Sequence, residues 1–133
     1  MKFLLDTSIC ISLIKRKPEK VLRQLSVLSV GDIGLSAVTL AELQYGVGKS
    51  VYKEKNQQAL KEFLIPLVVA DFDAEAAVVY GQVRSDLEKR GTPIGSLDTL
   101  IGAHALSLDL TLVTNNLREF RRIAGLKVVD WTV

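Results

Sequence analysis

Short apolar runs alternate along the chain with longer stretches in which apolar and polar residues recur at helical spacing. The short runs are rich in β-branched residues and predict strands at residues 2–6, 33–36, 67–70, 110–114 and 127–130. The longer stretches predict helices at residues 8–15, 18–26, 38–46, 52–64, 74–90, 96–108 and 117–123. Strands that alternate with helices indicate a parallel sheet covered on both faces, as the apolar run 67–70 also suggests. We therefore expect a single α/β domain over residues 1–133, a three-layer α/β/α sandwich with a central five-stranded, mainly parallel sheet.

Composition narrows the class of protein. A chain of 133 residues with 48% hydrophobic content can bury a core without a disulfide or a structural metal. Cys10 is the only cysteine, so it can neither form an internal bridge nor supply a zinc cage, and its apolar neighbours predict a buried thiol. Asp6 interrupts the apolar start, and no run approaches the ~20 apolar residues of a membrane span. The chain is therefore expected to be cytoplasmic, with no membrane partner.

Three acidic residues stand near the ends of predicted elements. Asp6 closes the first strand, Glu42 lies one turn into the helix after the second strand, and Asp98 opens the helix at residues 96–108. In a parallel α/β sheet, ligand crevices form outside the carboxyl ends of the strands. The three carboxylates are therefore expected to meet at one edge of the sheet.

Each acid also has a purely structural explanation. Asp6 suits a helix N-cap, Glu42 suits a capping box with Thr39, and Asp98 suits the first turn of a helix capped by Ser96. Taken singly, each structural explanation is the stronger one, but all three acids are expected at the same edge beside apolar residues. The neighbours expected to be buried are Leu5, Leu43 and Leu97. This joint placement favours one shared acidic site.

Converging carboxylates favour a bound cation. Two carboxylates ~5 Å apart repel by roughly 3 kcal/mol at an effective dielectric constant near 20. Ligand sets made only of carboxylate oxygens select Mg²⁺ or Mn²⁺ over zinc. His104, the only histidine, falls beside apolar residues of its helix and is interpreted as packed or hydrogen-bonded at the core edge rather than as a ligand or base. The pattern predicts a metal-dependent enzyme.

Four segments carry a resemblance to a known family. They are FLLDTS at 3–8, SAVTLAEL at 36–43, GTPIGSLD at 91–98 and LVTNNLREF at 112–120, and the ending at 125–131 is also similar. In this order and at this length they resemble the PIN-domain ribonucleases, and among these the VapC toxins of bacterial toxin–antitoxin pairs. The resemblance runs almost from end to end and implies a PIN-like fold.

The resemblance also implies roles for the acids. Asp6 and Asp98 would be the principal metal ligands, and Glu42 and Glu119 would be further catalytic acids that bind a second ion or orient the nucleophile. Many relatives carry an aspartate in the loop of the fourth motif, where this chain has two asparagines, so Glu119 is the nearest acid. The residues expected to support the carboxylates are Thr7, Ser8, Asn115 and Asn116.

The implied activity is that of an Mg²⁺-dependent endoribonuclease toxin, with Mn²⁺ as a substitute. The resemblance implies hydrolysis of RNA in the anticodon stem-loop of initiator tRNA, which inhibits translation, and it implies a homodimer neutralised by a VapB antitoxin that places an arginine in the acidic cleft. The net charge of +2 is too small to indicate a nucleic-acid partner by itself. The basic residues expected to contact RNA are Lys49, Lys53, Arg118, Arg121 and Arg122.

Two other functions remain open at this point. In a receiver-like signalling module of the same size, Asp71 would accept the phosphoryl group, Asp6 would bind Mg²⁺, Thr114 would be the switch hydroxyl and Lys127 would lie near the phosphate. This interpretation leaves the other two acids without a role. A catalytically silent RNA-binding domain is weaker still, because converging carboxylates repel phosphate when no metal is bound.

Overall fold

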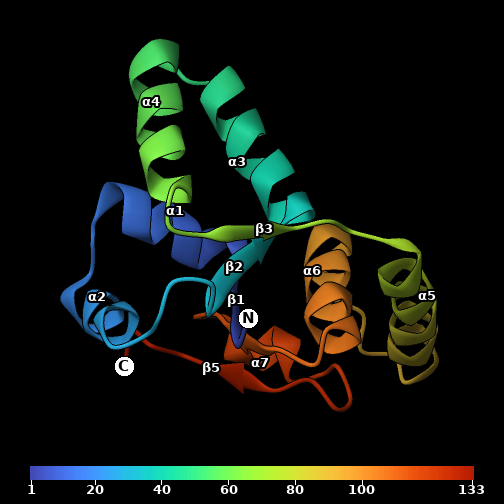
Figure 1. Ribbon diagram of the computed structural model, residues 1–133. Helices are drawn as coiled ribbons and strands as arrows, with labels where there is room; N and C mark the ends of the chain where they lie inside the picture. The colour runs from blue at the N-terminus through green and yellow to red at the C-terminus, as the bar shows by residue number, and fades with distance from the viewer.

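One five-stranded sheet organises the protein, in the order β3-β2-β1-β4-β5 (Figure 1). The structure is a computed structural model that describes residues 1–133, and every pair of neighbouring strands is parallel. The strands are β1 (Phe3–Leu5), β2 (Ile33–Ser36), β3 (Val68–Ala70), β4 (Thr111–Val113) and β5 (Val128–Val129). The helices are α1 (Thr7–Lys15), α2 (Glu19–Ser26), α3 (Ala37–Gly48), α4 (Lys53–Leu64), α5 (Ala74–Lys89), α6 (Ser96–Ser107) and α7 (Leu117–Phe120). The predicted α/β fold is confirmed, and the sheet is parallel throughout.

The third strand and the last helix differ from expectation. The apolar run 67–70 was expected to be covered on both faces, but β3 is an edge strand and Val68 is 37% exposed. Val69 does pack against the core, so the run reflects one buried face only. Helix α7 was expected to reach residue 123 but ends at Phe120, because the residues that follow form turns. Ile123 is nevertheless buried.

Two hydrophobic cores lie on opposite faces of the sheet. Adjacent residues of a strand point to opposite faces, so Leu5 joins the core beneath α1, α2, α3 and α4, whereas Leu4 joins the core with α5, α6 and α7. This arrangement confirms the three predicted layers. Cys10 lies in the first core as a buried free thiol, as predicted, and burial raises its pKa. No helix combines the length and the apolar character needed to cross a membrane.

The carboxyl ends of the central strands form one edge. The register pairs Leu5 of β1 with Leu35 of β2 on one side and with Val113 of β4 on the other. The residues that come next along the three strands are Asp6, Ser36 and Thr114. Helix α3 begins directly after β2, and together with α4 it forms a hairpin that stands above this edge (Figure 1). We call this hairpin the α3–α4 arm.

Candidate active site

Asp6 lies at the carboxyl end of the central strand, with hydrogen bonds to both oxygens of its carboxylate. Its side chain caps α1 by accepting the Ile9 N–H at 2.9 Å, and the Ser8 hydroxyl lies 3.2 Å from each oxygen. Thr114 donates a short hydrogen bond to Oδ2. Asp6 is only 3% exposed, and burial raises its pKa even though the hydrogen bonds lower it. The predicted N-cap is confirmed, and the same carboxylate also belongs to the acidic edge.

The fourth motif reaches Asp6 by two routes. The Asn116 N–H donates to the Thr114 hydroxyl at 2.9 Å, and the Asn116 side-chain amide donates to Glu119 at 3.2 Å. On the other route, Asn115 Oδ1 accepts a hydrogen bond from the Ser8 hydroxyl at 3.0 Å. Both asparagines therefore support other site residues. From the sequence we gave Thr114 a role only in the receiver alternative, although a hydroxyl directly after the strand beside β1 was the signal that could have placed it here.

Glu42 is tied to the residue that follows Asp6. The Thr7 hydroxyl donates to Glu42 Oε1 at 2.7 Å and lies 3.3 Å from the hydroxyl of the buried Thr39. The predicted capping box between Glu42 and Thr39 is wrong, because α3 takes Ser36 as its N-cap, three residues before Thr39. Glu42 is thereby left free to bond across to α1.

Asp98 faces the other three acids from the first turn of α6. Burial raises its pKa most, and the charges of Asp6, Glu119 and Glu42 add to this in that order of effect, which together bring the pKa to about 6. No hydrogen bond to the Asp98 carboxylate offsets these effects. The structure thus brings carboxylates from three other segments within electrostatic range of Asp98.

Two expectations about the surroundings of Asp98 are wrong. The N-cap of α6 is Gly95, which has no side chain to bond the first-turn amides, so Ser96 is inside the helix rather than its cap. Leu97 is 46% exposed rather than buried, because it faces outward beside the α3–α4 arm and lines a groove there. Asp98 therefore lies at an open rim.

The donor chemistry at this edge fits a hard divalent cation. The groups are all carboxylate oxygens, and neither Cys10, buried in the core, nor His104, engaged elsewhere, is available to them. Such a set suits Mg²⁺ or Mn²⁺ and does not suit zinc. As they stand, no three acidic, histidine or cysteine side chains are gathered tightly around one point. Mutual repulsion keeps carboxylates apart, and a cation that offsets it would let them approach.

The two lysines proposed to contact RNA belong to the α3–α4 arm. Lys49 caps the C-terminus of α3, and its Nζ lies 4.9 Å from the centre of the Tyr45 ring. Lys53 begins α4 and is exposed. Both cations therefore lie on the arm that stands over the acidic edge.

The three arginines proposed to contact RNA differ in what they bond. Arg118 and Arg121 are exposed at α7, next to the fourth motif. Arg122 donates to the Pro93 carbonyl at 3.0 Å, and its own carbonyl accepts a hydrogen bond from Arg90. Arg122 thus braces the loop that leads to Asp98, a role that the sequence did not suggest.

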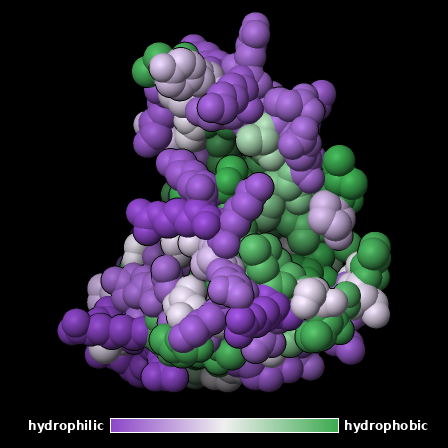
Figure 2. Space-filling view, turned by 90° about the vertical axis from the view of Figure 1, so that its left-hand side faces the viewer, coloured by the Kyte–Doolittle hydropathy of each residue, from purple (hydrophilic) through white to green (hydrophobic).

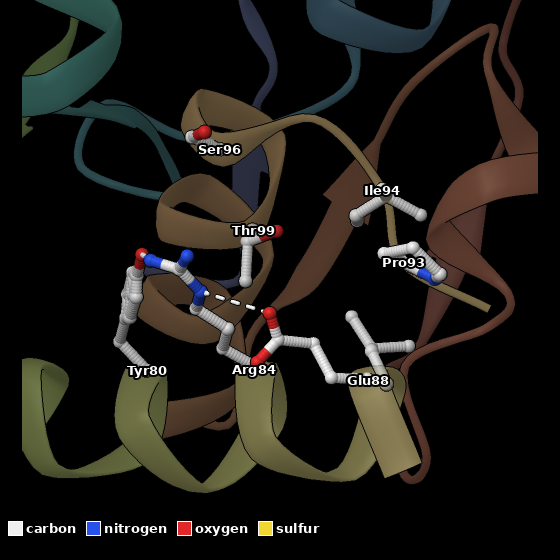
Figure 3. Close-up of a pocket in the computed structure, with 8 residues that line it drawn as sticks. Tyr80, Arg84, Glu88, Pro93, Ile94, Ser96 and Thr99 are labelled. Atoms are coloured by element: carbon white, nitrogen blue, oxygen red, sulfur yellow. Dashed lines mark hydrogen bonds and ion pairs between the residues drawn. The ribbon is translucent and has the colours of Figure 1, made fainter. Parts of the chain in front are cut away.

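Two hollows flank the acidic edge. A groove of about 750 Å³ runs between α1 and the α3–α4 arm, and Figure 2 shows apolar atoms gathered where the arm meets the body. Among its lining residues are Ile11, Ile14, Val47, Ala59 and Leu97, together with Glu42 of the acidic edge. A smaller pocket of about 160 Å³ lies between α5 and the start of α6 (Figure 3). There Arg84 donates to the Tyr80 hydroxyl at 2.9 Å and faces Glu88, close to Ser96 and Thr99.

His104 and Asp71 complete the account of the predicted residues. His104 is 1% exposed and bonds Ser36, so the interpretation as a packed, hydrogen-bonded histidine is confirmed. Asp71 follows the edge strand β3, and β2 separates that strand from β1 and Asp6. A receiver-like order would place the third strand beside the first. The strand order therefore rejects the signalling alternative.

Comparison with known proteins agrees with this geometry. A family model described as the PIN domain matches residues 3–126. The chain belongs to the PIN-domain family. It is 45% identical, over 98% of both chains, to a tRNA(fMet)-specific endonuclease VapC of Salmonella typhimurium, and 44% identical, over 98% of both chains, to ribonuclease VapC2 of Rickettsia felis. The predicted resemblance to VapC proteins is thus confirmed.

Solved structures of PIN-domain toxins show the same fold. VapBC from Salmonella typhimurium bound to DNA matches with a TM-score of 0.95 and 44% identity over 98% of both chains. VapBC2 from Rickettsia felis bound to a promoter fragment matches with a TM-score of 0.94 and 43% identity, over 98% of this chain and 99% of the other. The PIN-like architecture expected from the sequence is confirmed.

The raised pKa of Asp98 predicts how stabilisation by Mg²⁺ depends on pH. The carboxyl has a pKa of about 6, so at pH 5 it must release a proton before it can bind a cation, whereas at pH 7.5 it is already charged. We expect saturating Mg²⁺ to raise the free energy of unfolding by about 2 kcal/mol at pH 7.5 and by much less at pH 5. Urea unfolding at both pH values, with Mg²⁺ and with EDTA, measures this. An equal effect of Mg²⁺ at both pH values would contradict a site that includes Asp98.

Proposed function

We propose that this PIN-domain protein is a Mg²⁺-dependent endoribonuclease, the toxin of a toxin–antitoxin pair, and that Mn²⁺ substitutes for Mg²⁺. The observation that carries the proposal is the convergence of Asp6, Glu42 and Glu119 on Asp98, whose pKa burial and these three charges raise to about 6. Bound at these carboxylates, Mg²⁺ would act as a Lewis acid and lower the pKa of a water molecule. The ribonuclease names of relatives at 44–45% identity support the same reaction.

The residues divide the work according to their contacts. Asp98, which accepts no hydrogen bond from the protein, and Asp6, oriented by Thr114 and Ser8, would hold the cation. Glu42, fixed by Thr7, and Glu119, fixed by Asn116, would hold a second ion or accept a proton from the attacking water. Because each acid but Asp98 is oriented by a neighbour's hydroxyl or amide, the site is largely preorganised.

RNA is the proposed substrate, and initiator tRNA cut in the anticodon stem-loop is the proposed target. The name of the Salmonella typhimurium relative, a tRNA(fMet)-specific endonuclease, supports this target, and cleavage there would stop translation. Lys49 and Lys53 at the tip of the α3–α4 arm, and Arg118 and Arg121 at α7, would contact phosphates, whereas Arg122 is partly engaged by Pro93. Arg84, which the sequence did not single out, lies beside the first turn of α6 and is a further candidate for phosphate contact (Figure 3).

A VapB-type antitoxin is the proposed protein partner, and a homodimer is the proposed assembly of the toxin. VapBC complexes among the matching structures support the antitoxin. The apolar groove between α1 and the α3–α4 arm includes Glu42 in its wall, so an apolar segment bound there would lie next to the carboxylates. An arginine of that segment would then bind the acids and block the metal.

Cleavage of tRNA tests the proposed function. Purified toxin, free of antitoxin, is incubated with total tRNA in Mg²⁺, in Mn²⁺ and in EDTA, and the product ends are mapped by sequencing. We expect one discrete cut, in initiator tRNA, that disappears in EDTA. Discrete cleavage of another RNA would retain the nuclease and remove the tRNA target. Intact RNA with a folded protein in both metals would overturn the proposal.

A further inference from the structure

A single buried hydrogen bond joins the helix of Asp98 to the rest of the acidic edge. His104 Nδ1 lies 2.8 Å from Ser36 Oγ, and the two residues are 1% and 0% exposed. His104 is the fourth residue from the C-terminal end of α6, and Ser36 ends β2 and caps the N-terminus of α3. Among the side-chain hydrogen bonds of α6, the others stay within that helix and its own N-cap, from Thr99 to Gly95 and from Ser107 to His104.

The other side chains of α6 make mainly apolar contacts with neighbouring elements, and the His104 ring itself packs edge-on against Phe72. Ile101, Ala103 and Ala105 pack into the second core with residues of α5 and α7. Apolar packing is non-directional, so it holds a helix against its neighbours without fixing its rotation and height as sharply as a buried hydrogen bond does. The His104 to Ser36 bond is therefore the directional link that sets where α6 stands relative to α3.

Ser36 connects the position of α6 with the positions of Asp6 and Glu42. It lies next to Asp6 across the sheet, because the preceding residues of β1 and β2 are paired. As the N-cap of α3, its hydroxyl oxygen accepts the Val38 N–H at 3.0 Å. The same helix carries Glu42 one and a half turns later. One hydroxyl thus connects α6, which carries Asp98, with the helix that carries Glu42.

The direction of the bond follows from counting donors and acceptors. The Ser36 oxygen already accepts a backbone N–H, so its own O–H needs an acceptor, and His104 Nδ1 is the acceptor within reach. The ring is then neutral, with its proton on Nε2, which makes no well-formed hydrogen bond although the Asp71 backbone is near it. Burial lowers the pKa of His104 against the charges of Asp71 and Asp73, in agreement with a neutral ring.

We infer that His104 is a positioning residue of the nuclease, which holds Asp98 at the proper distance from Asp6 and Glu42 by accepting a hydrogen bond from Ser36. The inference rests on the proposed metal site. Its consequence is that metal affinity depends on a side chain that does not touch the metal, the carboxylates or the RNA. An ordinary core histidine would affect unfolding instead.

The test compares two substitutions with different hydrogen-bonding ability. Asn places its Oδ1 close to the position of Nδ1 and keeps an acceptor for Ser36, whereas Leu has a similar volume but no acceptor. We expect His104→Leu to weaken Mn²⁺ binding, followed by electron paramagnetic resonance, by about tenfold. His104→Asn should stay within about twofold of the original protein. In a Ser36→Ala background, where the acceptor of the bond has already lost its donor, His104→Leu should weaken binding little further.

Several results would overturn the inference. One is unchanged Mn²⁺ affinity in His104→Leu. Another is an equal loss of Mn²⁺ affinity in the Leu and Asn variants that follows the fall in the unfolding midpoint of each variant. His104 is the only histidine, so nitrogen NMR of the unmodified protein reports its proton directly even if a variant fails to fold. A proton on Nδ1 would reverse the bond and reject the proposed link. Failure of the unmodified protein to bind Mn²⁺ would instead remove the proposed function, and with it the role of His104.

Discussion

Replacing Asp98 by Asn is expected to abolish RNA cleavage while making the metal-free protein more stable. The amide keeps the shape of the side chain but cannot supply the charge that binds a hard cation, so we expect a loss of at least about 1000-fold in cleavage rate. The same change removes a carboxylate that burial and three neighbouring acids make costly to ionise. The rate of tRNA cleavage and the free energy of unfolding measure the two effects.

The stability gain from Asp98→Asn should depend on pH in a defined direction. The pKa of Asp98 is raised to about 6, so between about pH 4 and pH 6 the native state binds more protons than the unfolded chain. The unfolding free energy that Asp98 contributes therefore falls as pH rises through this window and stays low above it. Because Asp98 is partly exposed, we expect a gain from the substitution of only about 1 kcal/mol at pH 7.5 and near zero at pH 4. A variant that is less stable at pH 7.5 would contradict the electrostatic account.

Replacing Thr114 by Val is expected to damage the site through Asp6. The hydroxyl donates to Asp6 Oδ2 and accepts the Asn116 N–H, so the nearly isosteric Val removes one buried and one partly buried hydrogen bond at once. The Thr114 bond lowers the pKa of a carboxylate that burial raises, and its loss should raise that pKa further. We expect metal affinity to fall by about 10–100-fold and stability to fall by about 1–3 kcal/mol. Isothermal titration with Mn²⁺ and urea unfolding measure these.

Thr114→Ser is the matched control for this prediction. It keeps the hydroxyl and loses only a buried methyl group, so stability should fall by about 1 kcal/mol while metal affinity stays near that of the original protein. Equal Mn²⁺ affinity in the Val and Ser variants would show that Thr114 does not orient Asp6.

Much of this site was predictable because its residues stand at element ends. Asp6 closes a short apolar strand, and Asp98 opens a helix, and the parallel topology alone brings such positions to one edge. The structure adds that Asp6 is both helix cap and site acid, so these two interpretations never excluded each other. Leu97 shows the limit of local pattern, because this apolar residue next to the partly buried Asp98 is exposed in a groove.

The sequence could suggest residues that support the acids, but not which acid each of them contacts. Thr114 and Asp6 are 108 positions apart, and their hydrogen bond depends on β4 lying directly beside β1. The same holds for Thr7 with Glu42 and for His104 with Ser36, which depend on the height of one helix against another. Apolar periodicity shows which face of an element is buried, but it does not specify the order of strands or the register between them.

Direct binding of a divalent cation tests the central claim, that carboxylates from four segments form one metal site. Mn²⁺ is titrated into the antitoxin-free protein at pH 7.5, and free Mn²⁺ is followed by electron paramagnetic resonance, with Asp98→Asn measured beside it. We predict saturable binding to the original protein that Mg²⁺ displaces, and little binding to the variant. Identical free Mn²⁺ with the two proteins, at concentrations that support RNA cleavage, would contradict the claim.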